Sequence, residues 1–318
     1  MPADASTLVR RAGTGDPRAV ARLISMVENG SPALREITAE LCAVLRGRPA
    51  ARVIGLTGSP GVGKSTSTGM LVRLFRERGL RVGVLAVDPS SPFTGGALLG
   101  DRVRMQDHAT DPEVFIRSMA SRGHLGGLAW ATPQALRVLD AAGCEVILVE
   151  TVGVGQAEVE IASLADTTIV LLAPGMGDGV QAAKAGILEV ADVFAVNKAD
   201  REGVQATVRE LRSMTALAEG PWRPPIVTTV ASRGEGGEDL MRALDAHLRH
   251  LEESGELERR RLARAREEIE TLAVTALRAR LADVHGSAHL DTLAADVLAG
   301  RSDPYTAADT LLAALEGA

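Results

Sequence analysis

The stretch GLTGSPGVGKSTSTG at residues 55–69 constrains the fold of this chain more than any other. Residues 58–65 fit the pattern G-x-x-x-x-G-K-[ST] at every required position. A short apolar run, ARVIGLTG (51–58), precedes the pattern, and a helix-compatible segment (65–78) follows it. Glycines let a backbone wrap closely around a phosphate, while N–H groups and the helix N-terminus point at the anion. The sequence therefore predicts a phosphate-binding loop between a buried strand and a helix.

Side chains at the end of this loop have the chemistry that a nucleoside polyphosphate requires. Lys64 is expected to reach the β- and γ-phosphates, Ser65 to ligate Mg²⁺, and Thr66 to donate to the α-phosphate. The loop backbone is expected to line the nucleotide at Gly58, Ser59, Gly61, Val62 and Gly63.

Further short apolar runs alternate with helix-compatible stretches along the chain. This alternation predicts an α/β fold, a P-loop NTPase with a mostly parallel sheet flanked by helices. Aromatic residues are only 2% of the 318 residues, so the core must be aliphatic. The expected strands, after the one at 51–58, are 81–88, 145–151, 167–174, 192–200 and 225–231, with a shorter one at 113–119.

Helical extensions are expected on both sides of this core. We predict an N-terminal helical extension at 1–48, a GTPase domain at 49–255 and a C-terminal helical arm at 256–318. Segment 257–284 carries an amphipathic pattern. It either packs on its own domain or forms a dimerisation arm for a second subunit; the α/β core is complete before it, which favours the arm. Its apolar positions are Leu262, Ile269, Leu272, Leu277, Leu281 and Val284.

The base is predicted from an N-K-x-D sequence at the end of an expected strand. Asp200 can accept hydrogen bonds from both N1–H and the exocyclic amine of guanine, a pair that adenine does not offer. The stem of Lys198 can cover the base, and Asn197 can tie this loop to the phosphate loop. In many guanine-binding proteins a Ser-Ala pair follows the next strand; here Val230 replaces the serine, and Ala231 is the predicted backbone contact.

Carboxylates at strand ends predict a magnesium site, because Mg²⁺ prefers oxygen ligands. The candidates are Asp88, Asp101 and Glu150, and with Lys64 they are also the catalytic candidates, since phosphoryl transfer depends mainly on positioning and charge stabilisation. Gly153 is expected to donate its N–H to the γ-phosphate.

Together, GLTGSPGVGKST, VLAVDPSSPFTGGALLGDRVRM, VETVGVGQAEVE and LLAPGMGDGVQAAKAGILEVADVFAVNKAD closely resemble the MeaB-type GTPases, chaperones of adenosylcobalamin-dependent acyl-CoA mutases. The likeness runs from about residue 30 to residue 255. It implies slow GTP hydrolysis that the mutase accelerates, gating of cobalamin loading, replacement of damaged cofactor and a homodimer formed through the C-terminal arm. It also implies a switch segment at 175–186, with Asp178 and Lys184 at the matching positions.

Two other functions stay open: a metallochaperone GTPase and, less favoured, a small-metabolite kinase. The histidine pairs His247/His250 and His285/His289 have helical spacing but no cysteine beside them, and are expected to be surface features. Cys42 and Cys144 are expected to be small buried hydrophobes.

The remaining composition limits the partners and the location. The net charge of −6 disfavours binding to nucleic acid. The N-terminus has no apolar signal region, and no run of 18 apolar residues exists, so we expect a cytoplasmic protein without a membrane span.

Overall fold

The computed structural model describes residues 5–88, 108, 110–120, 131–151, 157–175, 189–216, 220–282 and 288–316. The chain divides into two compact units, Met1–Arg260 and Arg261–Ala318.

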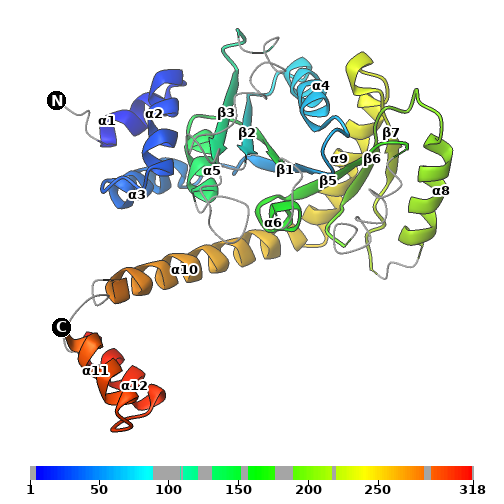
Figure 1. The fold of residues 1–318 in the computed structure, drawn as a ribbon. Coiled ribbons are helices and arrows are strands. Elements are labelled where there is room, and N and C mark those ends of the chain that lie inside the picture. Colours follow the sequence, from blue (N-terminus) through cyan, green and yellow to red (C-terminus); the bar gives the residue numbers. More distant parts are fainter. Residues whose placement is uncertain are drawn as a thin grey trace. The chain divides into compact units, whose positions relative to one another are not determined.

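Seven parallel strands form one sheet in the described part of the first unit, which confirms the predicted fold class (Figure 1). The order β3-β2-β4-β1-β5-β6-β7 places the first strand, which leads into the phosphate loop, in the centre. The strands are β1 (Arg52–Thr57), β2 (Val82–Asp88), β3 (Val114–Ala120), β4 (Val146–Thr151), β5 (Thr167–Leu172), β6 (Val193–Val196) and β7 (Ile226–Thr228).

Helices cover both faces of this sheet, because the central strands are apolar on both sides. Helices α4 (Lys64–Glu77) and α9 (Gly237–Glu253) share one apolar cluster with residues such as Ile54 and Leu148. The neighbouring strand residues Val53 and Ile147 point the other way, into a second cluster. On that face lie α5 (Thr132–Ala141), α6 (Ala157–Leu164) and, over β5 and β6, α8 (Val204–Thr215).

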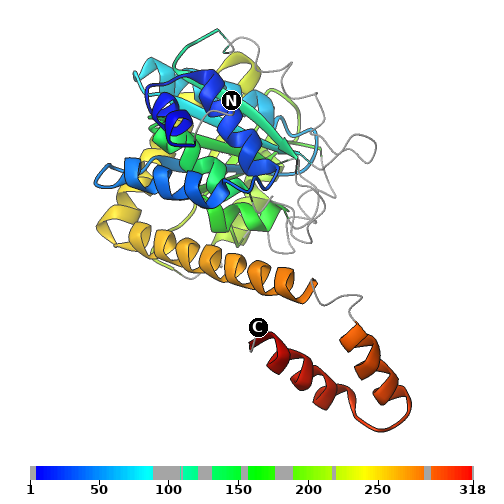
Figure 2. The ribbon, with the colours of Figure 1, turned by 90° about the vertical axis from the view of Figure 1, so that its left-hand side faces the viewer.

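Three N-terminal helices extend the second cluster: α1 (Ala5–Gly13), α2 (Pro17–Glu28) and α3 (Leu34–Leu45). Figure 2 looks onto these blue helices. Asp16 caps α2 by accepting from the N–H groups of Arg18 and Ala19 at 2.9 and 3.3 Å, and Pro17 occupies the first turn. Gly30, at φ 59°, follows the end of α2, in the left-handed conformation in which glycine commonly ends a helix.

Both cysteines were expected to be buried, and this is wrong for Cys42. Cys144 is buried, whereas Cys42 is exposed on α3. Helix α3 buries Ile37 and Leu41, and the residue after Leu41 is rotated by about 100° away from that face.

The described residues of the second unit, and those that lead into it, are mainly helical. They comprise α10 (Glu256–Ala282), α11 (Ala288–Leu298) and α12 (Pro304–Glu316). Several apolar side chains of α10 are exposed, among them Leu262, Ile269 and Leu277. Among the described residues, we find no helix with the length and apolar character that crossing a membrane requires.

Candidate nucleotide site

The phosphate loop connects the end of β1 to the first residue of α4, at the carboxyl edge of the sheet. Gly58, Gly61 and Gly63 have φ values of 139°, 81° and 97°, which residues that carry a side chain rarely adopt. Space is also limiting: a Cβ at Gly58 would overlap the carbonyl oxygen of Leu171, and one at Gly63 would overlap the side-chain nitrogen of Asn197. All three glycines are therefore needed for the turn, and Gly58 and Gly63 also for the close approach of neighbouring segments.

Lys64 is buried at the start of α4 and extends back over the loop. Its Nζ donates to the carbonyl oxygens of Gly58 at 2.6 Å and Ser59 at 3.1 Å. The loop thus holds a positive charge at the helix N-terminus, where anions are favoured. Thr66, two residues further along α4, is exposed at the same helix end.

Two hydroxyl groups of α4 converge on one carboxylate. Ser65 Oγ donates to Glu150 Oε1 at 2.6 Å, and Thr68 Oγ1 donates to Glu150 Oε2 at 2.9 Å. All three residues are buried, Glu150 with 4% of its surface exposed. Sequence reasoning missed Thr68; its position one turn after Ser65, facing the same strand, was the available signal.

The pairing of β2 with β4 places the end of β2 beside the carboxylate of Glu150. Ala86 of β2 pairs with Glu150 of β4, and Asp88 ends β2 two residues further on. Only the backbone of Asp88 is described. Asp101 and Gly153 lie outside the described residues, as do Asp178 and Lys184.

Asn197 joins the N-K-x-D loop to the phosphate loop. Its Nδ2 donates to the carbonyl oxygen of Val62 at 2.8 Å. Its Oδ1 accepts from the N–H of Ala231 at 3.0 Å and from Thr229 Oγ1 at 3.2 Å. The side chain is almost fully buried, so one amide connects three loops at the carboxyl edge. A bond from Ala231 N–H to a guanine oxygen would compete with the bond to Asn197, and the role of Ala231 stays a prediction.

The two charged residues of the same loop are more exposed. Lys198 has an unusual positive φ of 57°, and its Nζ donates to the carbonyl oxygen of Gly61 at 2.6 Å. Its stem therefore spans from the N-K-x-D loop to the phosphate loop. Asp200 forms an ion pair with Arg233, with 3.1 Å between Oδ2 and Nη2. Sequence reasoning did not identify Arg233, although it lies only two residues after Ala231.

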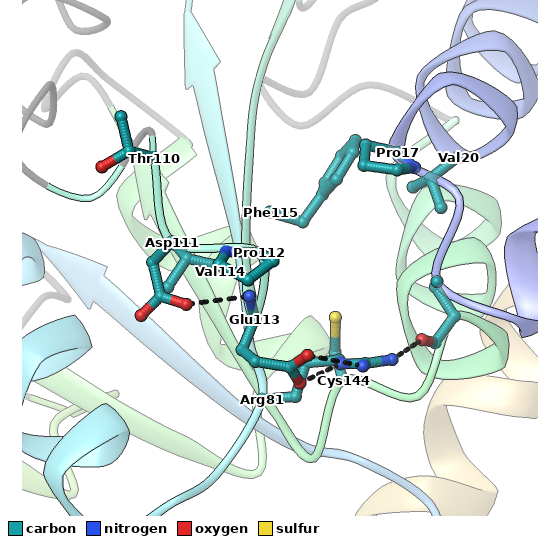
Figure 3. A pocket seen from close by; sticks show the side chains of 12 residues that line it. Pro17, Val20, Arg81, Thr110, Asp111, Pro112, Glu113, Val114, Phe115 and Cys144 are labelled. Atoms are coloured by element: carbon teal, nitrogen blue, oxygen red, sulfur yellow. Dashed lines mark hydrogen bonds and ion pairs between the residues drawn. The ribbon is translucent and has the colours of Figure 1, made fainter.

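One pocket lies at the opposite, amino edge of the sheet, away from these residues (Figure 3). It is a cavity of about 160 Å³ lined by residues just before β2 and β4, by residues before and at the start of β3, and by the turn before α2 with the first residues of that helix. Arg81 forms two bonds of 2.7 and 2.9 Å to Glu113 there. Burial raises the pKa of the Cys144 thiol to about 12, so this thiol stays protonated at neutral pH.

The prediction for the first histidine pair is wrong for His247, which is fully buried. His247 Nδ1 lies 2.9 Å from Thr167 Oγ1, and Nε2 lies 3.2 Å from Asp192 Oδ1. The ring also packs 4.8 Å from that of Trp222, measured between centroids. The i, i+3 spacing reflects the buried face of α9, and the described residues contain no group of three or more potential metal ligands. His285 and His289 have no described side chains.

The central strand, glycine loop and Lys64–Ser65 helix start define the chain as a P-loop nucleotide-binding protein. A crystal structure of an LAO/AO transport system kinase is 25% identical in sequence, has a TM-score of 0.69, and matches 99% of each chain.

Sequence comparison identifies the family. The family described as methylmalonyl Co-A mutase-associated GTPase MeaB matches residues 20–285. A Pyrococcus abyssi protein designated a GTPase is 48% identical over 98% of this chain and 96% of the relative. The GTPase ArgK of Escherichia coli is 36% identical over 79% of this chain and 78% of its own length. The methylmalonic aciduria type A homolog of Mus musculus is 36% identical over 68% of this chain and 54% of its own length. The chain belongs to the MeaB family of P-loop GTPases.

Proposed function

We propose that this chain hydrolyses Mg²⁺-bound GTP and uses the cycle to chaperone an adenosylcobalamin-dependent acyl-CoA mutase, gating cobalamin loading and reactivation. The observation that carries the nucleotide part is Asn197, whose amide links the N-K-x-D loop to the phosphate loop at Val62. In this proposal the link holds the base-reading carboxylate of Asp200 and the phosphate-binding loop on one support. A single nucleotide can then reach both.

In this proposal the phosphate loop binds through its backbone and through Lys64. The backbone N–H groups of Ser59 and of residues 61–64 surround the phosphates, and Thr66 reaches the α-phosphate. Lys64 exchanges its bonds to the loop carbonyls for the β- and γ-phosphate oxygens. Its charge then offsets the charge that develops during transfer of the phosphoryl group.

The donor set at Ser65 and Glu150 suits Mg²⁺. A hydroxyl and a carboxylate oxygen only 2.6 Å apart are hard ligands, and both are buried beside the phosphate loop. Bound Mg²⁺ would supply charge neutralisation at the phosphates. We assign Ser65, Asp88, Asp101 and Glu150 to this site, with Thr68 holding the Glu150 carboxylate in place. Gly153 is assigned to the γ-phosphate.

The base end reads guanine through Asp200. The carboxylate is exposed at the end of the loop after β6, and Lys198 Nζ bonds to Gly61 across the space between the two loops. In this proposal the Lys198 stem covers one face of the base. The hydrogen bond from Ala231 N–H to Asn197 Oδ1 supports the base-binding end of the site.

The mutase partner is inferred from the family. Its description names a methylmalonyl Co-A mutase-associated GTPase, and the murine relative is named for methylmalonic aciduria. The segment 175–186, with Asp178 and Lys184, is proposed to report the nucleotide state to the mutase.

The C-terminal arm is proposed to form a homodimer. The exposed Leu262, Ile269 and Leu277 recur along α10, and such a stripe is stabilised by packing against another helix. A truncation that tests this should keep Arg260, which bonds to Asp192 within the first unit. Deleting residues 261–318 should give a monomer by light scattering that still binds GDP; a full-length protein that is itself monomeric would contradict the dimer.

GTP turnover with and without a candidate mutase tests the function as a whole. We expect slow release of free phosphate from the GTPase alone, and acceleration by the cognate mutase. Lys184→Ala should keep the intrinsic rate and lose most of the acceleration. Phosphate that appears on a small-metabolite acceptor instead of in solution would support the kinase alternative, which the name of the solved relative raises.

A further inference from the structure

The ion pair between Asp200 and Arg233 occupies the carboxylate that we assign to guanine recognition. Arg233 Nη2 lies 3.1 Å from Asp200 Oδ2, and both side chains are about half exposed, at 54% and 45%. The donors of an arginine guanidinium resemble the N1–H and C2–amine edge of guanine, because both are N–H groups on a planar N–C–N unit. The arginine and the base therefore compete for the same carboxylate, where Arg233 contacts Oδ2.

The backbone on both sides of this pair is held by hydrogen bonds. Ala199 N–H donates to Thr229 at 3.0 Å, which fixes the N-K-x-D loop beside the end of β7. Arg233 N–H donates to Val230 at 2.9 Å within the short 3₁₀ turn η2 (Ala231–Arg233). The close approach of Asp200 and Arg233 is thus a consequence of two well-bonded loops.

A second acid offers Arg233 another partner in the same loop. Glu235 Oε1 lies 3.3 Å from Arg233 Nε. Val230 N–H also donates to the Glu235 carbonyl at 3.0 Å, which closes the turn and keeps the two side chains near each other. Arg233 can therefore leave Asp200 and stay paired with Glu235, without any movement of the backbone.

We propose that Arg233 is a positioning residue that competes with guanine for Asp200. In the nucleotide-free protein it neutralises the carboxylate; when GTP or GDP binds, the base displaces it toward Glu235. This inference rests on the proposed guanine site. The competition lowers the affinity for GTP and GDP equally, because both carry the same base, and so it favours nucleotide exchange.

The size of the effect follows from the exposure of the pair. Exposed ion pairs are weak, and the affinity of a ligand falls in proportion to the fraction of protein that is competent to bind. Arg233→Ala should therefore tighten GDP binding by about 2- to 5-fold. Glu235→Gln should have the opposite effect and weaken GDP binding. Of the two acids Asp200 and Glu235, only Asp200 is then left to pair with Arg233.

The test is calorimetric titration of GDP into the full-length chain. Arg242→Ala is the matched control, since Arg242 is a similarly exposed arginine paired with Asp239 on α9, and it should leave GDP affinity unchanged. In an Asp200→Asn background, measured with xanthosine diphosphate, Arg233→Ala should have no effect. Higher ionic strength should reduce the difference in GDP affinity between wild type and Arg233→Ala, because salt screens the ion pair between Asp200 and Arg233.

The outcomes separate this inference from the site on which it rests. Unchanged or weaker GDP binding in Arg233→Ala, with guanine still preferred over adenine, would overturn the competition and leave the guanine site standing. Tightening that persists in the Asp200→Asn background would also overturn it. Equal affinity of the wild-type chain for GDP and ADP would instead remove the guanine site.

Discussion

The two edges of the parallel sheet hold charged residues in different ways. At the carboxyl edge, the buried Glu150 accepts from the hydroxyls of Ser65 and Thr68, and the buried Lys64 donates to backbone carbonyls; the direct ion pair at this edge, Asp200–Arg233, is about half exposed. At the amino edge, acids and bases pair directly, as where Asp192 accepts two bonds of 3.0 Å from Arg260.

Under the proposed function, the difference separates charges that serve a ligand from charges that serve the fold. A neutral hydroxyl or carbonyl partner can be exchanged for a metal ion or a phosphate oxygen without leaving an uncompensated charge behind. A bidentate acid–base pair resists such exchange, because removing one partner leaves the other as an uncompensated charge. Charges at the carboxyl edge should therefore control turnover, and charges at the amino edge should control stability.

The largest expected effect is the loss of turnover in Lys64→Ala. Removing this pre-organised charge should lower kcat by two to three orders of magnitude, about what the loss of one such group costs in other active sites. Lys198→Ala is the control: it should weaken nucleotide binding and keep kcat at saturating GTP, because Lys198 lies at the base end. The rate of phosphate release at saturating GTP gives kcat for both variants. A Lys64→Ala protein with near-normal kcat would break the division of roles between the edges.

Asn197→Ala should reduce both stability and nucleotide binding, because this amide joins the loops of the carboxyl edge. The change leaves the carbonyl of Val62, the N–H of Ala231 and the hydroxyl of Thr229 without their bonds to Asn197. Buried groups that lose their partners cost about 1–3 kcal/mol each, and local rearrangement recovers part of this, so we expect a loss of about 2–4 kcal/mol in urea denaturation. Thr229→Val, which removes only one of the three bonds, is the milder control. Equal losses of stability and nucleotide binding in both variants would show that the Asn197 amide does not hold the loops together.

Residue types and order predicted the sheet, because each signal was local. A glycine loop after an apolar run requires a strand and a helix on either side, and both formed at Arg52–Thr57 and Lys64–Glu77. The acid at Glu150 was identified from its place at a strand end, and the register brings it next to Ser65.

The features that sequence reasoning missed depend on contacts between distant segments. His247 was assigned to the surface because only its spacing to His250 was visible; its burial comes from Thr167, Asp192 and Trp222, on three other segments. Arg233 gave no signal either, because its contact with Asp200 arises only when β6 and β7 pair side by side.

The smallest expected effect concerns pH and the amino edge. Burial opposes ionisation of Asp192, but bonds from His247 and Arg260 outweigh it, so the pKa of this carboxyl lies below its ordinary value. A lowered folded-state pKa means that the ionised carboxyl stabilises the fold. This contribution is complete above the unfolded-state pKa of about 4 and is lost as the pH falls through the folded-state pKa.

Asp192→Asn should therefore lower the free energy of unfolding by about 1–2 kcal/mol at pH 7, with a smaller difference from wild type below pH 4. GTP turnover at pH 7 should stay the same, since Asp192 lies at the edge opposite the phosphate loop. Asp111→Asn is the control: Arg76 also lowers the pKa of that carboxyl, but the pair is more exposed and should contribute less. Urea denaturation from pH 3 to pH 7 gives the free energy of unfolding of the wild type, Asp192→Asn and Asp111→Asn. If Asp192→Asn instead lowered kcat while leaving stability intact, charges at the amino edge would have to be assigned to the nucleotide cycle as well.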